Sequence, residues 1–217
     1  MKLDYIECGD CLELIKGVPD NSVDLVVTDP PYEFQGAGFL RGGGAFGDKK
    51  KDYHNEYQNL TKEAYELKKL SERKLKQGAS VKDISDSFNF EILDECCRVL
   101  KKMNFYVWCS KTQVRKLLNY FDDKGCFIDI LCWHKTNPIP TCNGTYLNDT
   151  EYLIFAREKG VKVYGSYKTK RKWYVTPTNK KDKDKYKHPT IKPLEIIENL
   201  IINSSVEGGG NTRYLYG

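Results

Sequence analysis

A short segment near the N-terminus has the residue types and spacing needed to hold an amine. Residues 23–32 read Val-Asp-Leu-Val-Val-Thr-Asp-Pro-Pro-Tyr, an apolar run followed by a carboxylate, two prolines and an aromatic ring. Asp29 and the Pro30 carbonyl can accept hydrogen bonds, and Tyr32 offers a flat face with a polar tip. Two such acceptors would favour a pyramidal nucleobase amine with its lone pair directed at an electrophile, while the ring stacks on the base. The alternative is a plain Asp-Pro turn.

The element before this segment decides where these groups lie. The apolar run from Val23 to Val27 is typical of a central strand in a parallel sheet, and Pro30 and Pro31 end it because proline cannot donate to a ladder. Ligands of open α/β sheets bind at the carboxyl ends of the strands. We therefore predict a catalytic group at such an end, made of Asp29, Pro30, Pro31 and Tyr32.

Three segments, in this order, resemble the DNA amino-methyltransferases that use S-adenosylmethionine. Ile6 to Glu13 with Pro19 to Asp24 is similar to the family's opening segment, and residues 29–32 are similar to its catalytic segment. His188-Pro-Thr-Ile-Lys-Pro193 is similar to its His-Pro-Thr-x-Lys-Pro signature. The order matches the circularly permuted subgroup, in which the catalytic segment precedes the cofactor-binding segment. Asp at position 29 favours adenine N6 as methyl acceptor; cytosine N4, for which the family more often carries Ser, is the alternative.

The resemblance also implies a set of cofactor-binding residues. Asp10 and Cys11 are expected near the adenosine of S-adenosylmethionine, and His188, Thr190 and Lys192 near its sugar or carboxylate. Lys192 has the simplest physical rationale, since an ammonium group suits an anionic carboxylate.

Two later segments are candidates for contact with double-stranded DNA. Cys132 to Pro140 resembles the family's loop beside the pocket for an extruded base, so Trp133 and Asn137 are expected around that base. Residues 164–187 interleave lysine and arginine with aromatic rings, a pattern suited to phosphates and unpaired bases. A solvated loop is the alternative for this stretch. The basic residues singled out for DNA binding are Lys170, Arg171 and Lys172.

Strands separated by helices predict the fold class. The apolar pattern indicates an α/β fold with a doubly wound, mostly parallel sheet, and the resemblance makes it the Rossmann-like methyltransferase type. We expect a single methyltransferase domain over residues 1–217. Within it, residues 33–89 are expected to form a lid or insertion, for which a flexible linker is equally consistent, and residues 135–187 a target-recognition region.

The C-terminal segment departs from the family pattern. Family members continue from the helix after the His-Pro-Thr-x-Lys-Pro signature into a strand and a glycine loop beneath the cofactor, whereas here family-like sequence stops at Glu207. This predicts a truncated chain whose sheet is incomplete at the C-terminus. A second polypeptide could then complete the cofactor pocket, or the chain could be an inactive remnant that binds DNA.

Composition sets the outer limits. Net charge of +5 fits an anionic partner but is a mild bias. No leader and no long apolar run is visible, so we expect a cytoplasmic protein without a membrane segment, whose eight cysteines are free thiols. Cys8 and Cys11 have metal-ligand spacing, but no second pair follows, and no metal site is expected. A restriction-modification setting is implied by the resemblance alone.

Overall fold

The computed structural model describes residues 7, 9–32, 89–138, 146–179, 182, 185, 191–205 and 214–216. The chain divides into two compact units, Met1–Pro30 with Asn89–Gly217, and Pro31–Phe88. Apart from Pro31 and Tyr32, the second unit lies outside the described residues. The lid expected over residues 33–89 and the assignment of one domain to the whole chain therefore remain predictions.

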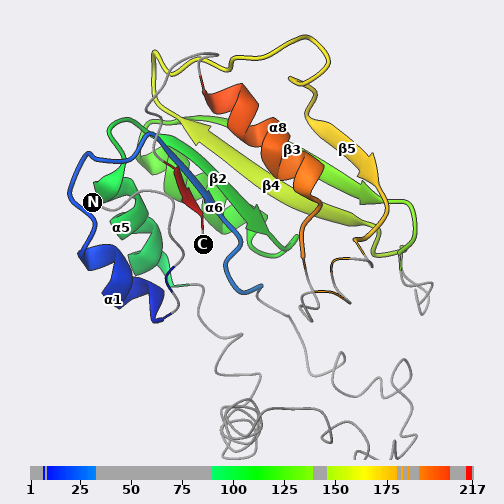
Figure 1. Cartoon of the computed structure of the whole chain (residues 1–217), viewed down its shortest axis with the longest axis horizontal. Helices are drawn as coiled ribbons and strands as arrows, with labels where there is room; N and C mark the ends of the chain where they lie inside the picture. The colour runs from blue at the N-terminus through cyan, green and yellow to red at the C-terminus, as the bar shows by residue number, and fades with distance from the viewer. Residues whose placement is uncertain are drawn as a thin grey trace, which may run out of the picture. The chain divides into compact units, whose positions relative to one another are not determined.

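The first unit is built on a six-stranded sheet of order β5-β3-β4-β2-β1-β6 (Figure 1). Pairing is parallel between β1 and β2, between β1 and β6, and between β3 and β5, whereas β4 runs antiparallel to both β2 and β3. The predicted α/β, mostly parallel sheet is confirmed, with β4 as the reversed strand. The bounds are β1 Leu25–Thr28, β2 Asn104–Cys109, β3 Phe127–Lys135, β4 Thr150–Arg157, β5 Trp173–Thr176 and β6 Tyr214–Tyr216.

Helices cover both faces of this sheet, as a doubly wound fold requires. Tyr106 of β2 accepts a hydrogen bond from Ser204 at the end of α8, whereas the adjacent Phe105 packs its ring against Phe121 of α6. Because neighbouring residues of a strand point to opposite faces, α8 and α6 lie on opposite sides. The helices are α1 Cys11–Lys16, α5 Phe90–Val99, α6 Val114–Asp123 and α8 Leu194–Ser204.

Local sequence accounts for the ends of several helices. The Asn89 side chain accepts the amide hydrogen of Glu91 and caps α5, and Asp10 caps α1 through the amide of Leu12 at 2.9 Å. After α6 the backbone turns at Gly125, whose φ of 69° favours glycine.

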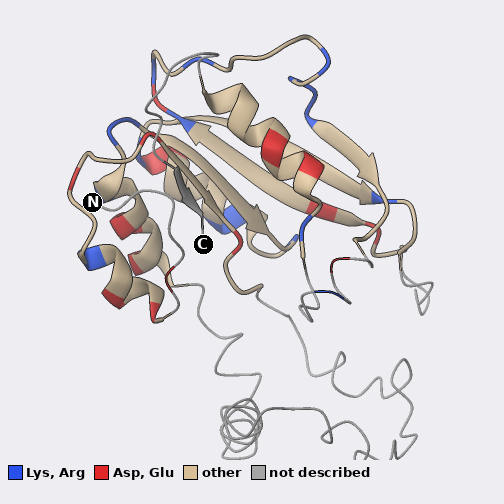
Figure 2. Cartoon of the chain, in the orientation of Figure 1, with Lys and Arg blue, Asp and Glu red and all other residues tan. Residues whose placement is uncertain are grey.

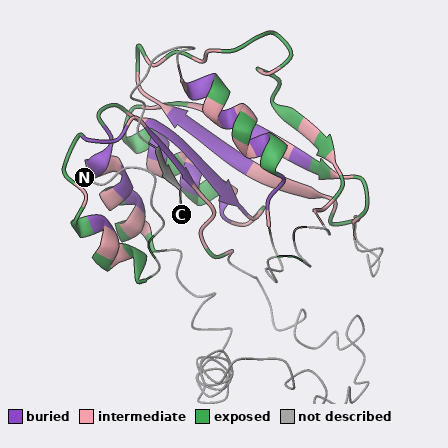
Figure 3. Ribbon diagram, viewed as in Figure 1, coloured by how far each residue is buried: buried purple, intermediate pink, exposed green. Residues whose placement is uncertain are grey.

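The core lies where the central strands meet the helices (Figure 3). All six residues of β2 are buried, which fits its place inside the sheet. The largest fully buried side chains include Trp108, Tyr106, Phe105, Phe121, Leu93 and Leu200.

Two strand assignments differ from the sequence-based expectation. β3 continues to Lys135, so that Trp133 to Lys135 lie in the strand and not in a loop. The pairing of Lys135 with Thr176 of β5 extends the strand to this residue. A strand also follows Glu207, in a segment where none was expected: β6 pairs in parallel with β1, with Leu25 beside Tyr214. Backbone pairing thus continues on the outer side of β1.

Candidate catalytic site

Three charged residues from separate strands reach one edge of the sheet. Asp29 follows the last residue of β1, and Lys135 is the last residue of β3. Glu151 is the second residue of β4 and pairs with Trp133. Because β4 runs opposite to its neighbours, its amino end lies at the carboxyl ends of β1 and β3. This is the edge at which α/β sheets bind ligands.

An alternating chain of ion pairs links these residues through Lys192, which lies two residues before α8. Lys135 Nζ is 2.7 Å from Glu151 Oε1, and Lys192 Nζ is 2.9 Å from Glu151 Oε2. Lys192 Nζ is also 2.9 Å from Asp29 Oδ2. Among the described residues, these three ion pairs join two cations and two anions, and they include the predicted catalytic carboxylate of Asp29.

The ion pairs are largely shielded from water. The side chain of Lys192 is 5% exposed, and those of Glu151 and Asp29 are 17% and 23% exposed. Lys192 Nζ also lies 5.1 Å from the ring centroid of the buried Trp108. Burial raises the pKa of Glu151, but the two lysines outweigh it and hold that pKa below its ordinary value. Glu151 is thus a carboxylate at neutral pH.

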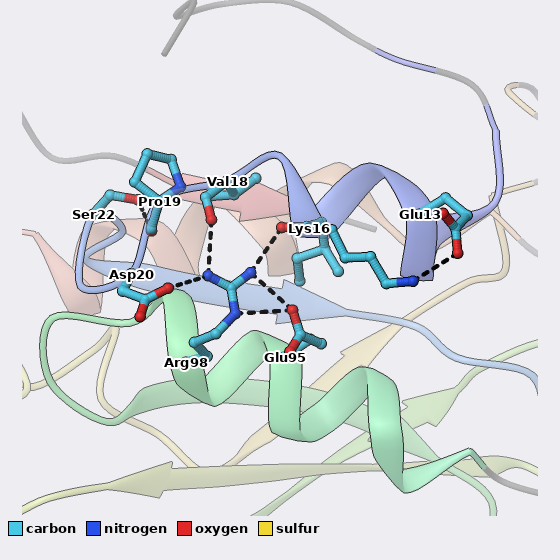
Figure 4. A network of polar contacts seen from close by, with 9 residues as sticks. Glu13, Lys16, Val18, Pro19, Asp20, Ser22, Glu95 and Arg98 are labelled. Carbon is cyan, nitrogen blue, oxygen red and sulfur yellow. Dashed lines mark hydrogen bonds and ion pairs between the residues drawn. The ribbon is translucent and has the colours of Figure 1, made fainter.

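Arg98 of α5 anchors the loop that joins α1 to β1 (Figure 4). Its guanidinium donates to the carbonyls of Val18 and Ile15, each at 2.9 Å, and pairs with Asp20 and Glu95. The loop it holds leads from the segment with the predicted cofactor residues to the strand that ends at Asp29. Arg98 thereby fixes the entry to β1.

The predicted cofactor residues are only partly brought together. Asp10 and Cys11 are exposed at the start of α1, where Asp10 acts as the helix cap. Lys192 differs from expectation in its partners, because its ammonium contacts two protein carboxylates where a cofactor carboxylate was expected. Its contact with the cofactor remains a prediction. His188 and Thr190 lie outside the described residues.

The predicted base-contacting residues are tied to β5 or its following turn. Trp133 is buried, and its Nε1 donates to Thr176 Oγ1 at 2.9 Å. Asn137 is exposed, and its Oδ1 accepts the Thr178 amide hydrogen at 2.6 Å. Trp133 is therefore part of the scaffold, and Asn137 is the more accessible of the two.

Pro31 and Tyr32 directly follow Asp29 and Pro30 in the chain but begin the second unit.

The basic stretch is exposed along the connection from β4 into β5 (Figure 2). Lys170, Arg171 and Lys172 lie immediately before β5, and the Arg171 guanidinium carbon is 5.2 Å from the ring centroid of Trp173. Trp173 is itself half exposed. The Lys172 ammonium pairs with the Asp129 carboxylate, whereas Lys170 and Arg171 do not share this ion pair.

Glu151 and Lys135 were not identified as site residues from the sequence. Glu151 directly precedes the apolar run from Tyr152 to Ala156, and Lys135 lies in the segment Cys132 to Pro140 that was expected to form a loop. The available signal was the pair of charged residues at the ends of two apolar runs, since buried charges in such places need partners.

Among the residues that the structure describes, no cluster of three or more candidate metal ligands occurs. Nor does any helix of this part have the length and apolar character needed to cross a membrane. The six described cysteines are free, and burial raises the pKa of Cys96 and of Cys109 to about 12.

The chain belongs to the DNA methylase family of the N6/N4 type, whose model matches residues 23–211. This confirms the predicted family, and the family itself includes both adenine-N6 and cytosine-N4 types.

Curated relatives are type II methyltransferases. The chain is 26% identical over 215 residues to the type II methyltransferase M2.MboI of Moraxella bovis, covering 91% of this chain and 69% of that protein. It is 27% identical over 223 residues to M.HinfI of Haemophilus influenzae, covering 94% of this chain but 56% of that protein. The chain thus spans little more than half of M.HinfI.

Solved structures share the fold. The M1.HpyAVI–SAM complex superposes with a TM-score of 0.59 at 19% identity and covers 98% of this chain and 81% of that one. The cytosine-N4-specific PvuII DNA methyltransferase has a TM-score of 0.53 at 17% identity, covering 91% and 69%. The fold class is confirmed.

Proposed function

We propose that this chain transfers a methyl group from S-adenosylmethionine to the N6 amine of adenine in double-stranded DNA. The observation that carries the proposal is the Asp29 carboxylate, held 2.9 Å from Lys192 at the carboxyl edge of the sheet and followed directly by Pro30, Pro31 and Tyr32. A fixed acceptor that is followed in the chain by an aromatic residue suits a planar base that carries an amine.

Each residue of the catalytic segment has a separate role in this proposal. Asp29 and the Pro30 carbonyl accept the two amine hydrogens and thereby direct the nitrogen lone pair. Tyr32 stacks on the extruded base, which returns about 1–3 kcal/mol of the energy spent on unstacking. As the new N–CH₃ bond forms, the bond between the methyl group and the sulfonium of the donor would break and leave a neutral thioether. The amine loses one proton, and Asp29 takes it up directly or through water.

The described residues fit the cofactor in part. S-adenosylmethionine, when bound, supplies an electrophilic methyl group on a sulfonium. Asp10, already a helix cap, retains acceptor capacity because a carboxylate has about four lone-pair sites, and this suits ribose hydroxyls. Cys11 lies beside it. A calorimetric titration of the purified chain with S-adenosylmethionine tests this step: micromolar binding that weakens in Asp10→Ala supports it, and no binding by the folded chain contradicts it.

DNA binding is assigned to the exposed basic segment before β5. Lys170 and Arg171 can neutralise phosphates, and Trp173 offers an exposed ring. Asn137 is proposed to face the extruded base, and the buried Trp133 is proposed to hold the strand end from which Asn137 follows. A cytoplasmic location and a possible second polypeptide at the cofactor site remain part of this proposal.

Product analysis decides the acceptor. DNA incubated with the chain and methyl-labelled S-adenosylmethionine is digested to nucleosides, which are separated and identified by mass. Label in N6-methyladenine supports the proposal. Label in N4-methylcytosine would show that cytosine N4 is the acceptor. DNA binding without any label would favour the inactive remnant.

A further inference from the structure

Lys192 bridges two strands that do not touch each other. In the sheet order β4-β2-β1, Glu151 belongs to the first strand and Asp29 follows the third. Lys192 Nζ lies 2.9 Å from each carboxylate and 5.1 Å from the ring of Trp108 on the middle strand β2. The Lys192 ammonium therefore lies over the buried indole of Trp108 and connects the two strands on either side of β2.

Glu151 is one of two carboxylates that contact the Lys192 ammonium. Lys192 comes from the segment before α8 and has no ladder of its own, whereas Glu151 is registered in β4 opposite Trp133. The two oxygens of Glu151 contact different lysines, Oε1 to Lys135 and Oε2 to Lys192. Glu151 is thus held from one side by β3, and it presents the other oxygen to Lys192.

Stability alone does not explain this arrangement. Desolvation of buried ion pairs offsets much of their attraction, and apolar side chains of similar volume often stabilise such a site as well or better. A buried carboxylate that contacts two ammonium groups does, however, fix their geometry closely, because hydrogen bonds to charged groups are short and directional. One of those ammonium groups contacts the proposed catalytic carboxylate.

We infer that Glu151 is a positioning residue for methyl transfer: it holds the Lys192 ammonium against Asp29 and so sets the orientation of the carboxylate that receives the amine. This inference rests on the proposed function for its catalytic consequence. The geometric part, Glu151 holding Lys192, stands independently of any activity. Glu151 itself touches neither the amine nor the methyl group in this scheme.

The geometric part is tested by the ¹⁵N signal of the Lys192 ammonium, assigned through its loss in Lys192→Met. Buried and bonded to two carboxylates, this group exchanges its hydrogens slowly in the wild-type chain. In Glu151→Gln we expect exchange at least about tenfold faster, because a neutral amide is a weaker acceptor than a carboxylate. The exposed pair of Lys101 with Asp24 is the internal control and should not change.

The catalytic part is tested by steady-state methylation. Glu151→Gln should lower kcat by about 10–100-fold and leave KM for DNA and for S-adenosylmethionine within about threefold, the pattern of a group that acts only in the transition state. Glu195→Gln, an exposed change in the first turn of α8, is the matched control.

A second variant separates positioning from charge balance and from misfolding. Glu151→Gln leaves an excess buried cation, whereas Glu151→Gln with Lys135→Met restores neutrality and should fold. We expect the double variant to keep the fast ammonium exchange and the low kcat. Recovery of both by neutrality alone would overturn the inference, as would unchanged ammonium exchange in Glu151→Gln. If the wild-type chain transfers no methyl group, the proposed function fails, and the ammonium signal alone decides whether Glu151 holds Lys192.

Discussion

The Lys192 ammonium lies 2.9 Å from the Asp29 carboxylate, although the two residues are far apart in the sequence. Asp29 follows the last residue of β1, and Lys192 lies two residues before α8. The pair therefore joins the two segments that resemble the family's catalytic and cofactor signatures. Its burial makes it sensitive to the loss of either partner.

Replacement of Lys192 by Met should destabilise the fold. Asp29 and Glu151 would then both lose their contact with the Lys192 ammonium, and breaking a buried pair by removing one partner costs about 3–5 kcal/mol. The free energy of unfolding in urea measures this. Lys101→Met, which removes an exposed pair with Asp24, should cost less than about 1 kcal/mol. Equal losses in the two variants would show that the buried site is not special.

Replacement of Arg98 by Ala should release the loop between α1 and β1. The change removes hydrogen bonds to two backbone carbonyls and two carboxylates, and hydrogen bonds from charged groups contribute about 1.5–3 kcal/mol. We expect a loss of that order in urea unfolding, together with faster amide exchange in residues 15–20. Arg115→Ala on the exposed surface of α6 should change stability by no more than about 0.5 kcal/mol. A neutral Arg98→Ala would disprove the anchoring role.

The contribution of Glu151 to stability should disappear in acid. Its folded pKa lies below the ordinary value of 4.5 because Lys192 and Lys135 favour the charged form over the effect of burial. A lowered folded pKa means that the stabilisation is present above the unfolded pKa and is lost as pH falls through the folded pKa. The stability difference between wild type and Glu151→Gln should therefore be largest near neutral pH and shrink below about pH 4. A difference that grows in acid would contradict the assigned pairing.

Removal of single basic residues before β5 should reduce the salt dependence of DNA binding. Each phosphate contact contributes about 0.9 to the slope of log K against log salt concentration. Lys170→Ala and Arg171→Ala should each lower the slope by about that amount, measured by fluorescence anisotropy with duplex DNA. Lys159→Ala, in the turn just after β4 and outside the proposed DNA-binding segment, should leave it unchanged. Equal effects of all three changes would indicate binding through net charge alone.

Local patterns predicted the elements that make up the core. The helical spacing of apolar residues from Phe90 to Leu100 predicts a helix, and the apolar run from Phe105 to Cys109 predicts a buried strand. These segments correspond to α5 and β2 within a residue at each end. The strand that ends at Asp29 was also predicted, because two prolines stop a ladder wherever they occur. Each of these signals depends on neighbouring residues alone.

What escaped prediction depends on pairing between distant segments. β3 is extended by β5, and β6 is stabilised by the outer side of β1, so neither boundary follows from its own sequence. The role of Glu151 required the reversed direction of β4, which brings the start of that strand to the ends of the others. A charged residue before an apolar run gives no indication of its partner until the strand order is known.

Single-turnover transfer of labelled methyl groups to duplex DNA, by wild type and by Asp29→Asn, tests the catalytic assignment most directly. The substitution keeps the shape of Asp29 and removes its charge, so transfer should slow by about 10²–10⁴-fold while DNA binding persists. Transfer by Asp29→Asn at the wild-type rate would contradict the assignment of methyl transfer to this carboxylate.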